Sequence, residues 1–388
     1  MSKRVLGIAV VGIGGAVGTT MAAGIALLRR GLIDTTGLPL AGSEAALAGY
    51  KEIVFAGWDL FPDDLAAAAE GHEVLTYKQH VAISDELAQI EPWPAIGDPR
   101  FLSVIEGSNK IASGGHRAVI EQLRSNLAAF KAKCDGAVVI NLASTEKLGD
   151  AADPTFASLA SFESALDADS PAVSPAMLYA YAAIAERVPY GNFTPSLSAD
   201  IPALVEFAVK MNVPVAGKDG KTGQTFIKTV LAPALRARAL HIDGWYSTNI
   251  LGNRDGLALS NEDSLASKIH TKRSVLDEML GYDVEDHIVD IRYYRPRGDD
   301  KEAWDNIDIR GFLGRTMQLK VNFLCKDSIL AAPLAIEIAR CLDLAAQRGD
   351  GGVQEQLGVF FKMPMTRSDT PEHAFFVQSA TLDRWLAS

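Results

Sequence analysis

The stretch VLGIAVVGIGGAVGTT, residues 5–20, passes from an apolar run into a cluster of glycines, and an alanine-rich segment then continues to Arg30. Residues 5–11 are typical of a buried parallel strand, and the segment from Thr19 predicts a helix. Glycines between a strand and a helix let backbone N–H groups approach a pyrophosphate at the positive end of the helix. The stretch therefore predicts a dinucleotide-binding turn, although its spacing is one residue longer than the usual pattern. The alternative is a glycine turn of purely structural origin.

The predicted contacts to the dinucleotide begin with the loop itself, which supplies Gly12, Gly14, Gly15, Gly18 and Thr19. A carboxylate for the ribose hydroxyls is expected about 20 residues further on, at the end of the second strand. Asp34 has that sequence spacing but lies in a predicted loop, whereas Asp59 closely follows the apolar run at 53–57. We therefore expect Asp59 to bind the ribose, and an acid there favours NAD over NADP.

The composition is that of a soluble globular protein of two or three domains: 388 residues, 48% hydrophobic and 22% charged. A net charge of −11 argues against nucleic acid or an anionic membrane as a partner. The basic start and first apolar run imitate a signal peptide, but glycines interrupt the run, and no stretch of about 18 apolar residues predicts a membrane span. Cys134, Cys325 and Cys341 show neither disulfide nor zinc spacing, so a cytoplasmic location is expected.

Strand and helix patterns alternate through the first half of the chain. Helical periodicity is present at 117–133, 175–187 and 199–211, and a buried strand is expected at 137–142. Such alternation is typical of a parallel sheet with helices on both faces.

The pattern changes after residue 222. Strand-like stretches at 241–250, 287–294 and 315–324 favour a mixed or antiparallel sheet with one covered face, and a helix is predicted from 328 to 344. The predicted fold class is therefore α/β, in three parts. Residues 1–221 form a doubly wound, Rossmann-type domain, residues 222–326 form an inserted α+β domain, and residues 327–388 return to the first domain.

A second region combines charge with glycine, from GKDGKTGQT at 217–225 through NILGNRDG at 249–256 to Lys268 and Lys272. If 262–280 is a helix, both lysines fall on its apolar stripe, at about 100° per residue. Two lysines four residues apart repel each other, and an anion between them would reverse that interaction. The pair therefore indicates either an anion site or two ammonium groups that extend along the edge of the stripe to water.

Further lysines stand beside unusual backbone: Lys301 in RGDDK, Lys326 in CKD and Lys362 in FFKMP. Each alone is more typical of the surface than of an active site. The seven histidines form no ligand spacing, and no nucleophile elbow or metalloprotease motif is present. A dinucleotide site with several lysines and aspartates indicates chemistry beside a carbonyl, because ammonium groups stabilise oxyanions and enolates.

At these residues the chain resembles the myo-inositol-phosphate synthase family over nearly its whole length. The matching segments are Gly12–Thr20, Gly217–Thr225, Asn249–Gly256, Ser267–Lys272, Gly298–Lys301, Cys325–Ala331 and Lys362–Pro364. The chain departs from the family at Ala16 and Val17, where many members carry asparagines, in the loop 141–146, and at Lys326, where many carry glutamate.

The resemblance implies that the chain converts glucose 6-phosphate to inositol phosphate on one bound NAD, without net oxidation. C5 is oxidised, the ketone enolises and closes on the C1 aldehyde, and the new ring is reduced. The substrate phosphate itself is a candidate base for the enolisation. The family's four lysines correspond to Lys268 and Lys362 at the C5 oxygen, Lys301 at the C1 or C5 oxyanion, and Lys272 at the phosphate.

The resemblance also implies the rest of the site. The phosphate would be held by Thr222, Gly223, Gln224 and Thr225, together with Lys272. Asn249 would bind sugar hydroxyls, and Asn141, Ser144 and Asp327 would complete the cofactor site. The aspartates that would orient lysines or hold a cation are Asp219, Asp255, Asp299 and Asp327. Whether a divalent metal or a monovalent cation is required stays open, and no metal ligands are assigned.

In the family the inserted domain is catalytic and builds a tetramer through its sheet, so a homotetramer is expected. Three rival interpretations remain. They are a related cyclase acting on another phosphosugar, an ordinary NAD dehydrogenase, and a non-catalytic NAD-binding regulatory protein. Several lysines without a histidine acid or base fit the dehydrogenase poorly, and an intact lysine set argues against the regulatory protein.

Overall fold

The computed structural model describes residues 4–102, 106–112, 114–252, 276–368 and 370–388. Its larger part is a parallel sheet of seven strands in the order β11-β6-β5-β4-β1-β2-β3. The strands, all paired in parallel, are β1 (Leu6–Val11), β2 (Ile53–Asp59), β3 (Trp93–Pro94), β4 (Gly136–Asn141), β5 (Tyr190–Asn192), β6 (Pro214–Gly217) and β11 (Gly352–Val353). The predicted doubly wound α/β fold is confirmed.

Helices cover both faces of this sheet because alternate residues of its central strand are apolar on each side. Ala9 and Val11 of β1 pack in one core cluster, and Leu6, Ile8 and Val10 pack in the other. The first cluster contains side chains of α4 (Gly115–Lys131), α5 (Leu159–Asp167), α6 (Pro175–Ala185) and α7 (Pro202–Met211). The second contains side chains of α1 (Ala16–Arg29), α2 (Leu65–His72), α3 (Tyr77–Leu87), α11 (Asp327–Arg348) and α12 (Phe375–Ala387).

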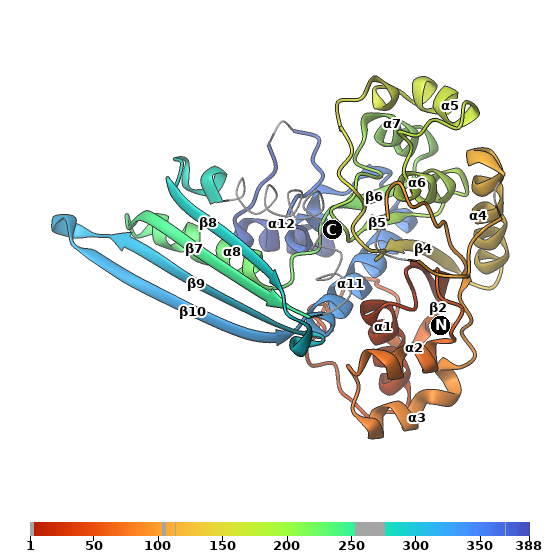
Figure 1. Cartoon of the computed structure of the whole chain (residues 1–388), viewed down its shortest axis with the longest axis horizontal. Helices are drawn as coiled ribbons and strands as arrows, with labels where there is room; N and C mark the ends of the chain where they lie inside the picture. The colour runs from red at the N-terminus through yellow and green to blue at the C-terminus, as the bar shows by residue number, and fades with distance from the viewer. Residues whose placement is uncertain (1–3, 103–105, 113, 253–275, 369) are drawn as a thin grey trace.

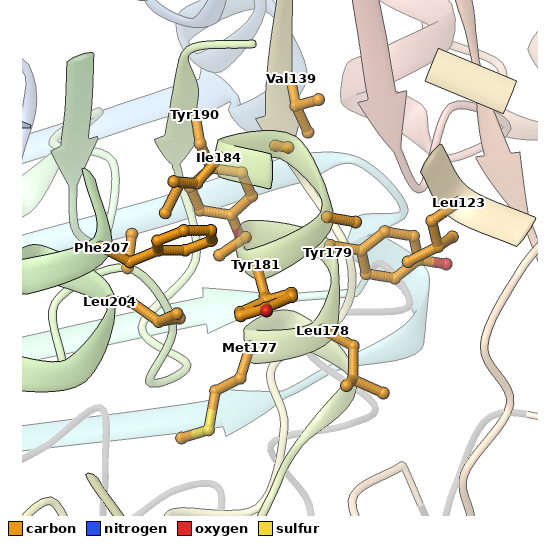
Figure 2. Packing of buried hydrophobic residues seen from close by; sticks show 14 of the residues in the cluster. Leu123, Val139, Met177, Leu178, Tyr179, Tyr181, Ile184, Tyr190, Leu204 and Phe207 are labelled. Carbon is orange, nitrogen blue, oxygen red and sulfur yellow. The ribbon is translucent and has the colours of Figure 1, made fainter. Parts of the chain in front are cut away.

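The helix α6 is buried along almost its whole length, as expected from its run of apolar residues. Figure 2 shows its side chains between the sheet residues Val139 and Tyr190 on one side and α7 on the other. The rings of Tyr181 and Phe207 stack with centroids 4.9 Å apart. This packing places α6 between α7 and the strands β4 and β5.

The remaining strands form a second sheet in the order β10-β9-β7-β8. They are β7 (His241–Leu251), β8 (Asp286–Tyr293), β9 (Asp300–Arg310) and β10 (Thr316–Lys326). The pair β7–β8 is parallel, and β9 is antiparallel to both β7 and β10, so the sheet is mixed. Figure 1 shows this sheet as an arm that extends from the seven-stranded body.

One face of the second sheet is covered by α8 (Gln224–Ala237) and by the helical residues 276–280. Ile242, Trp245, Ile307 and Ile309 form the core there with Ala232. The strand β9 was not predicted from the sequence. Its inward positions alternate as a strand requires, but one of them is Asp305, and this buried charge interrupts the apolar pattern.

The connection from the second sheet back to the first determines where the site lies. The strand β10 ends at Lys326, and α11 begins at Asp327 and packs against the seven-stranded sheet. Figure 1 shows the start of β9 and the end of β10 beside α11 at the junction of the two sheets. The domain limits at 221 and 326 stay predictions. Within the described ranges, no helix has the length and apolar character needed to cross a membrane.

Candidate active site

A cavity of about 260 Å³ opens at the junction of the two sheets. Its walls come from the glycine loop, from the carboxyl ends of β2 and β4, and from the loop after β6. The start of β9, the start of α11 and the segment after residue 360 complete it. The predicted site residues that line it are Gly12, Gly15, Gly18, Asp59, Asn141, Ser144, Asp219, Thr222, Lys301, Asp327 and Lys362. The cavity thus unites residues predicted for the cofactor with residues predicted for catalysis.

The glycine loop between β1 and α1 has the backbone that a pyrophosphate site needs. Gly12 has a φ of +83°, which glycine adopts without steric cost. A Cβ on Gly18 would lie 2.5 Å from the carbonyl oxygen of Ile13, so only glycine allows α1 to pack this closely on the turn. Gly15 caps α1 without a side-chain hydrogen bond, which leaves the first N–H groups of the helix for an anion.

The two candidate ribose ligands lie in different surroundings. Asp59 is 8% exposed and lines the cavity at the end of β2. Its Oδ2 accepts a hydrogen bond from the N–H of Gly14 at 2.8 Å, and its Oδ1 accepts one from Phe61 at 3.0 Å. Asp34 is exposed in a turn region away from the cavity lining. Of the two candidate ribose ligands, Asp59 is therefore the one that lies at the cavity.

Two other residues predicted for the cofactor lie at the end of β4. Asn141 is buried, donates to the Oδ1 of Asn192 at 3.2 Å and accepts from the N–H of Ala143 at 3.1 Å, so its amide is held in one orientation. Ser144 lies three residues further on, in the cavity wall. Thr19 is different, because its hydroxyl donates to Gly15 within α1 and it is not a lining residue.

Lys362 and Asp219 form a buried ion pair in the cavity wall. The Nζ of Lys362 lies 2.6 Å from the Oδ1 of Asp219, and the two side chains are 10% and 5% exposed. The backbone N–H of Lys362 also donates to the carbonyl of Asp219, at 2.7 Å. The Oδ2 of Asp219 has no hydrogen-bond partner among the described residues. This oxygen can therefore accept a hydrogen bond from a further group in the cavity.

Lys301 and Asp327 form a second ion pair, with the Nζ of Lys301 3.1 Å from the Oδ1 of Asp327. The hydroxyl of Thr222 donates to the same carboxylate oxygen at 3.4 Å. Asp299 does not line the cavity. It accepts hydrogen bonds from the hydroxyl and N–H of Ser328 at the start of α11, and burial raises the pKa of its carboxyl. It therefore holds the helix that carries Asp327.

The predicted phosphate residues surround the start of α8, which Gly223 caps without a side-chain hydrogen bond. Thr222 lines the cavity, whereas Gln224, Thr225 and Asn249 are buried behind it. The amide of Asn249 donates to Gln224, and Gln224 donates to Asp305 at 3.1 Å. The Oγ1 of Thr225 and the Oδ1 of Asn249 have no hydrogen-bond partner among the described residues. Lys268, Lys272 and Asp255 lie outside the described residues.

Glu146 and His72 also line the cavity, and neither was among the predicted site residues. Glu146 is 5% exposed, accepts the N–H of Ala176 at 2.8 Å, and burial raises the pKa of its carboxyl to about 7. The position of Glu146 just after β4 could have indicated it. His72 contacts the carbonyl oxygen of Gly14 through its Nε2 at 2.8 Å, and no local pattern marks it. In the described part of the chain, no group of three or more His, Cys, Asp or Glu side chains is arranged to hold a metal ion.

The fold and the cavity define an NAD-dependent enzyme of Rossmann type, with ammonium–carboxylate pairs beside the dinucleotide turn. The family model for myo-inositol-1-phosphate synthase matches residues 41–387. The chain is 43% identical to inositol-3-phosphate synthase 1 of Bacteroides thetaiotaomicron, over 96% of this chain and 92% of that protein. It is 31% identical to a probable inositol 3-phosphate synthase isozyme of Arabidopsis thaliana, over 88% of this chain and 75% of that protein.

Solved structures agree on the fold. The inositol-3-phosphate synthase of Caenorhabditis elegans superposes with a TM-score of 0.93 at 24% identity, over 99% of this chain and 86% of that one. A myo-inositol-1-phosphate synthase-related protein of Thermotoga maritima gives a TM-score of 0.84, also at 24% identity, over 99% of each chain. The chain belongs to the myo-inositol-1-phosphate synthase family. The predicted family, enzyme class and NAD cofactor are thereby confirmed.

Proposed function

We propose that the chain converts D-glucose 6-phosphate to 1D-myo-inositol 3-phosphate, using NAD catalytically. The observation that carries this proposal is the single cavity that joins the dinucleotide turn to Lys362–Asp219 and Lys301–Asp327. The relatives named inositol-3-phosphate synthase, at up to 43% identity among those compared above, support the same reaction. The glycine loop and Asp59 would hold NAD, which would supply the hydride acceptor for oxidation at C5 and the hydride donor for the later reduction.

Lys362 is the residue we assign to the C5 oxygen. Negative charge develops on that oxygen when the ketone enolises, and a buried ammonium stabilises it more strongly than a hydrated one would. Asp219 holds the ammonium at 2.6 Å and is itself held through its backbone carbonyl, so the pair is oriented before substrate binds. By the family resemblance Lys268 shares this role.

Lys301 is the residue we assign to the C1 or C5 oxyanion of the ring-closing step. Asp327 pairs with its ammonium group and also accepts a hydrogen bond from Thr222. Asp299 accepts a hydrogen bond from Ser328 and so holds the start of α11, where Asp327 lies. We assign the substrate phosphate to the start of α8, where uncapped N–H groups and the hydroxyl of Thr222 are anion donors. Lys272 would complete that phosphate site, and the phosphate itself would serve as the base for enolisation.

The test is incubation of the purified protein with glucose 6-phosphate and substoichiometric NAD, followed by phosphorus NMR. The expected result is inositol phosphate, with more than one turnover for each NAD. Net accumulation of NADH would instead indicate a dehydrogenase. Absence of product with every added divalent and monovalent cation would contradict the synthase, and turnover of another phosphosugar alone would identify a related cyclase.

We also propose a homotetramer built through the second sheet. The face of that sheet opposite α8 leaves Tyr246, Ile288, Trp304 and Leu324 between 36% and 58% exposed. Tyr246 is paired with Ile288 in register, and its ring lies 5.4 Å from that of Trp304. Tyr246, Ile288 and Trp304 are therefore neighbours on this face, and exposed apolar side chains that lie together are typical of an interface. The three free cysteines support a reducing, cytoplasmic compartment.

A further inference from the structure

Lys221 is a buried lysine that the proposed chemistry does not use. It is 3% exposed and lies between Asp219 and Thr222 of the cavity wall, but it does not line the cavity itself. Its Nζ donates to the Oε1 of Gln378 at 2.6 Å and lies 5.9 Å from the centre of the Phe375 ring. Among the described residues no carboxylate pairs with it, and burial lowers the pKa of its ammonium to about 7. A methionine would fill this space without the cost of burying an amine.

The partner of Lys221 is held in one orientation. Gln378 is 5% exposed, belongs to α12, and donates through its Nε2 to the carbonyl of Glu372 at 2.6 Å. Because the amide nitrogen is occupied in this way, its oxygen has to face Lys221. His373 lies beside them, and burial together with the charge of Lys221 lowers the pKa of its ring to about 4. The Nε2 of this ring lies 2.9 Å from a carboxylate oxygen of Glu278.

The backbone around Lys221 is part of the contact that brings the catalytic pair together. The N–H of Lys221 donates to the carbonyl of Phe360 at 2.8 Å, and Gly220 forms an antiparallel bridge with Phe361. The next bond in this ladder joins the N–H of Lys362 to the carbonyl of Asp219 at 2.7 Å. A shift of Lys221 along this ladder would therefore change the register that sets Lys362 against Asp219.

We propose that Lys221 is a positioning residue. Through its hydrogen bond with Gln378, the C-terminal helix α12 holds the loop 217–222 against residues 360–365 and so keeps Lys362 in contact with Asp219. The rings of Phe226 in α8 and Phe375 in α12 meet edge to face at 5.2 Å, so α12 also touches the helix assigned to the phosphate. The catalytic consequence rests on the proposed function of Lys362, whereas the structural coupling does not.

The first test is Lys221→Met, which removes the ammonium and keeps most of the stem. We expect kcat for inositol phosphate to fall about 10- to 100-fold, because small displacements of catalytic groups have effects of this size. The dissociation constant of NAD should stay within about twofold, since Lys221 is not in the cavity wall beside the cofactor residues. Gln378→Leu should reproduce the loss, and the double variant should lose little more than either single one.

The matched control is Lys228→Met. Lys228 is also buried, is 1% exposed and contacts His287 in the second sheet rather than α12. A loss of kcat that both lysine variants show reports the removal of a buried amine. The additional loss of kcat in Lys221→Met over that in Lys228→Met reports positioning. Wild-type kcat in folded Lys221→Met or Gln378→Leu, with only a lower melting temperature, would overturn the proposal.

Amide hydrogen exchange separates this inference from the proposed function. In Lys221→Met the peptides that cover 217–222 and 360–365 should exchange faster, while those that cover β1 and α1 should not change. Faster exchange in Lys221→Met, combined with a wild-type protein that makes no inositol phosphate, would support the coupling and refute the reaction. Unchanged exchange at both segments would refute the coupling, whatever the activity. Because Gln378→Leu keeps Lys221 itself, it gives the same readout if Lys221→Met fails to fold.

Discussion

Lys362 and Asp219 are 143 residues apart in the sequence, yet the Nζ of one and a carboxylate oxygen of the other lie 2.6 Å apart in the wall of the cavity. The contact depends on a backbone ladder between the loop after β6 and the segment after Phe360. Both residues are nearly buried, so their charges are screened weakly by solvent and depend on each other.

Replacement of Lys362 should abolish turnover. In Lys362→Ala we expect kcat to fall about 100- to 1000-fold or more, the effect of removing one group that stabilises an oxyanion. The fold and the NAD affinity should be nearly kept, because the predicted NAD contacts are the glycine loop and Asp59, whereas Lys362 is assigned to the sugar. Steady-state kinetics and cofactor titration measure both. Lys326→Ala is the control, since Lys326 is paired with Asp300 in solvent. Wild-type activity in Lys362→Ala would remove the residue from the mechanism.

The glycine loop allows a test within one helix. The new Cβ of Gly18→Ala would meet the Ile13 carbonyl at 2.5 Å, so α1 has to move and its N–H groups leave the pyrophosphate. We expect the dissociation constant of NAD to rise about tenfold or more. Gly24→Ala lies in the same helix with no atom within 4 Å of the new Cβ, and should stabilise the fold by about 1 kcal/mol without changing NAD affinity. Equal NAD affinity in both variants would contradict this account of the loop.

Glu146 should make stability depend on pH. Burial raises the pKa of its carboxyl from 4.5 to about 7. Between these pH values the folded chain binds more protons at Glu146 than the unfolded chain, so the free energy of unfolding falls as pH rises, by about 3 kcal/mol in total. Glu146→Gln removes this contribution. The free energy of unfolding of the wild type minus that of the variant, measured by urea unfolding, should therefore decrease from pH 4.5 to 7 and stay constant above pH 7.

The control for that series is Glu70→Gln, an exposed glutamate on α2. Its unfolding free energy should follow that of the wild type at every pH. A pH-independent difference between wild type and Glu146→Gln would show that the carboxyl of Glu146 titrates normally in the folded chain.

The exposed face of the second sheet should form the interface of the proposed tetramer. Trp304→Glu places a charge next to Tyr246 on that face, and we expect the tetramer to dissociate, as measured by light scattering after gel filtration. Tyr77→Glu changes an aromatic residue that is 81% exposed on α3, away from the sheet, and should leave the mass unchanged. A tetramer that persists in Trp304→Glu, or a wild-type monomer, would contradict the proposed interface.

Several features could be predicted because their cause is local. The strand β1 and the turn after it depend on an apolar run and on two glycines, Gly12 with its positive φ and Gly18, which packs on Ile13 five residues away. Asp59 was preferred to Asp34 because parallel strands bring their carboxyl ends to one edge, and the structure has Asp59 at that edge. A mixed or antiparallel second sheet was predicted from the change in alternation after residue 222, and the sheet is mixed.

Other features could not be predicted from local patterns. The strand β9 was missed because Asp305 occupies an inward position, where Gln224, Trp245 and Ser247 all donate to it. The separation of Thr222 in the cavity wall from Gln224 and Asn249 behind it depends on how α8 meets β7. Asp299 and Asp327 are both aspartates, so the sequence does not distinguish their roles. In the folded chain Asp299 binds Ser328 at the start of α11, and Asp327 binds Lys301.

The sequence by itself determined the dinucleotide turn, the α/β class and the family, because these follow from residue types at short spacing and from motifs in order. The tertiary structure decided which ammonium faces which carboxylate. Lys362 meets Asp219 through the backbone ladder between the loop after β6 and the segment after Phe360. Lys301 meets Asp327 because β9 pairs with β10, which leads into α11. Charge pairs are non-directional and short-ranged in water, so their partners are selected by the packing of the backbone that carries them.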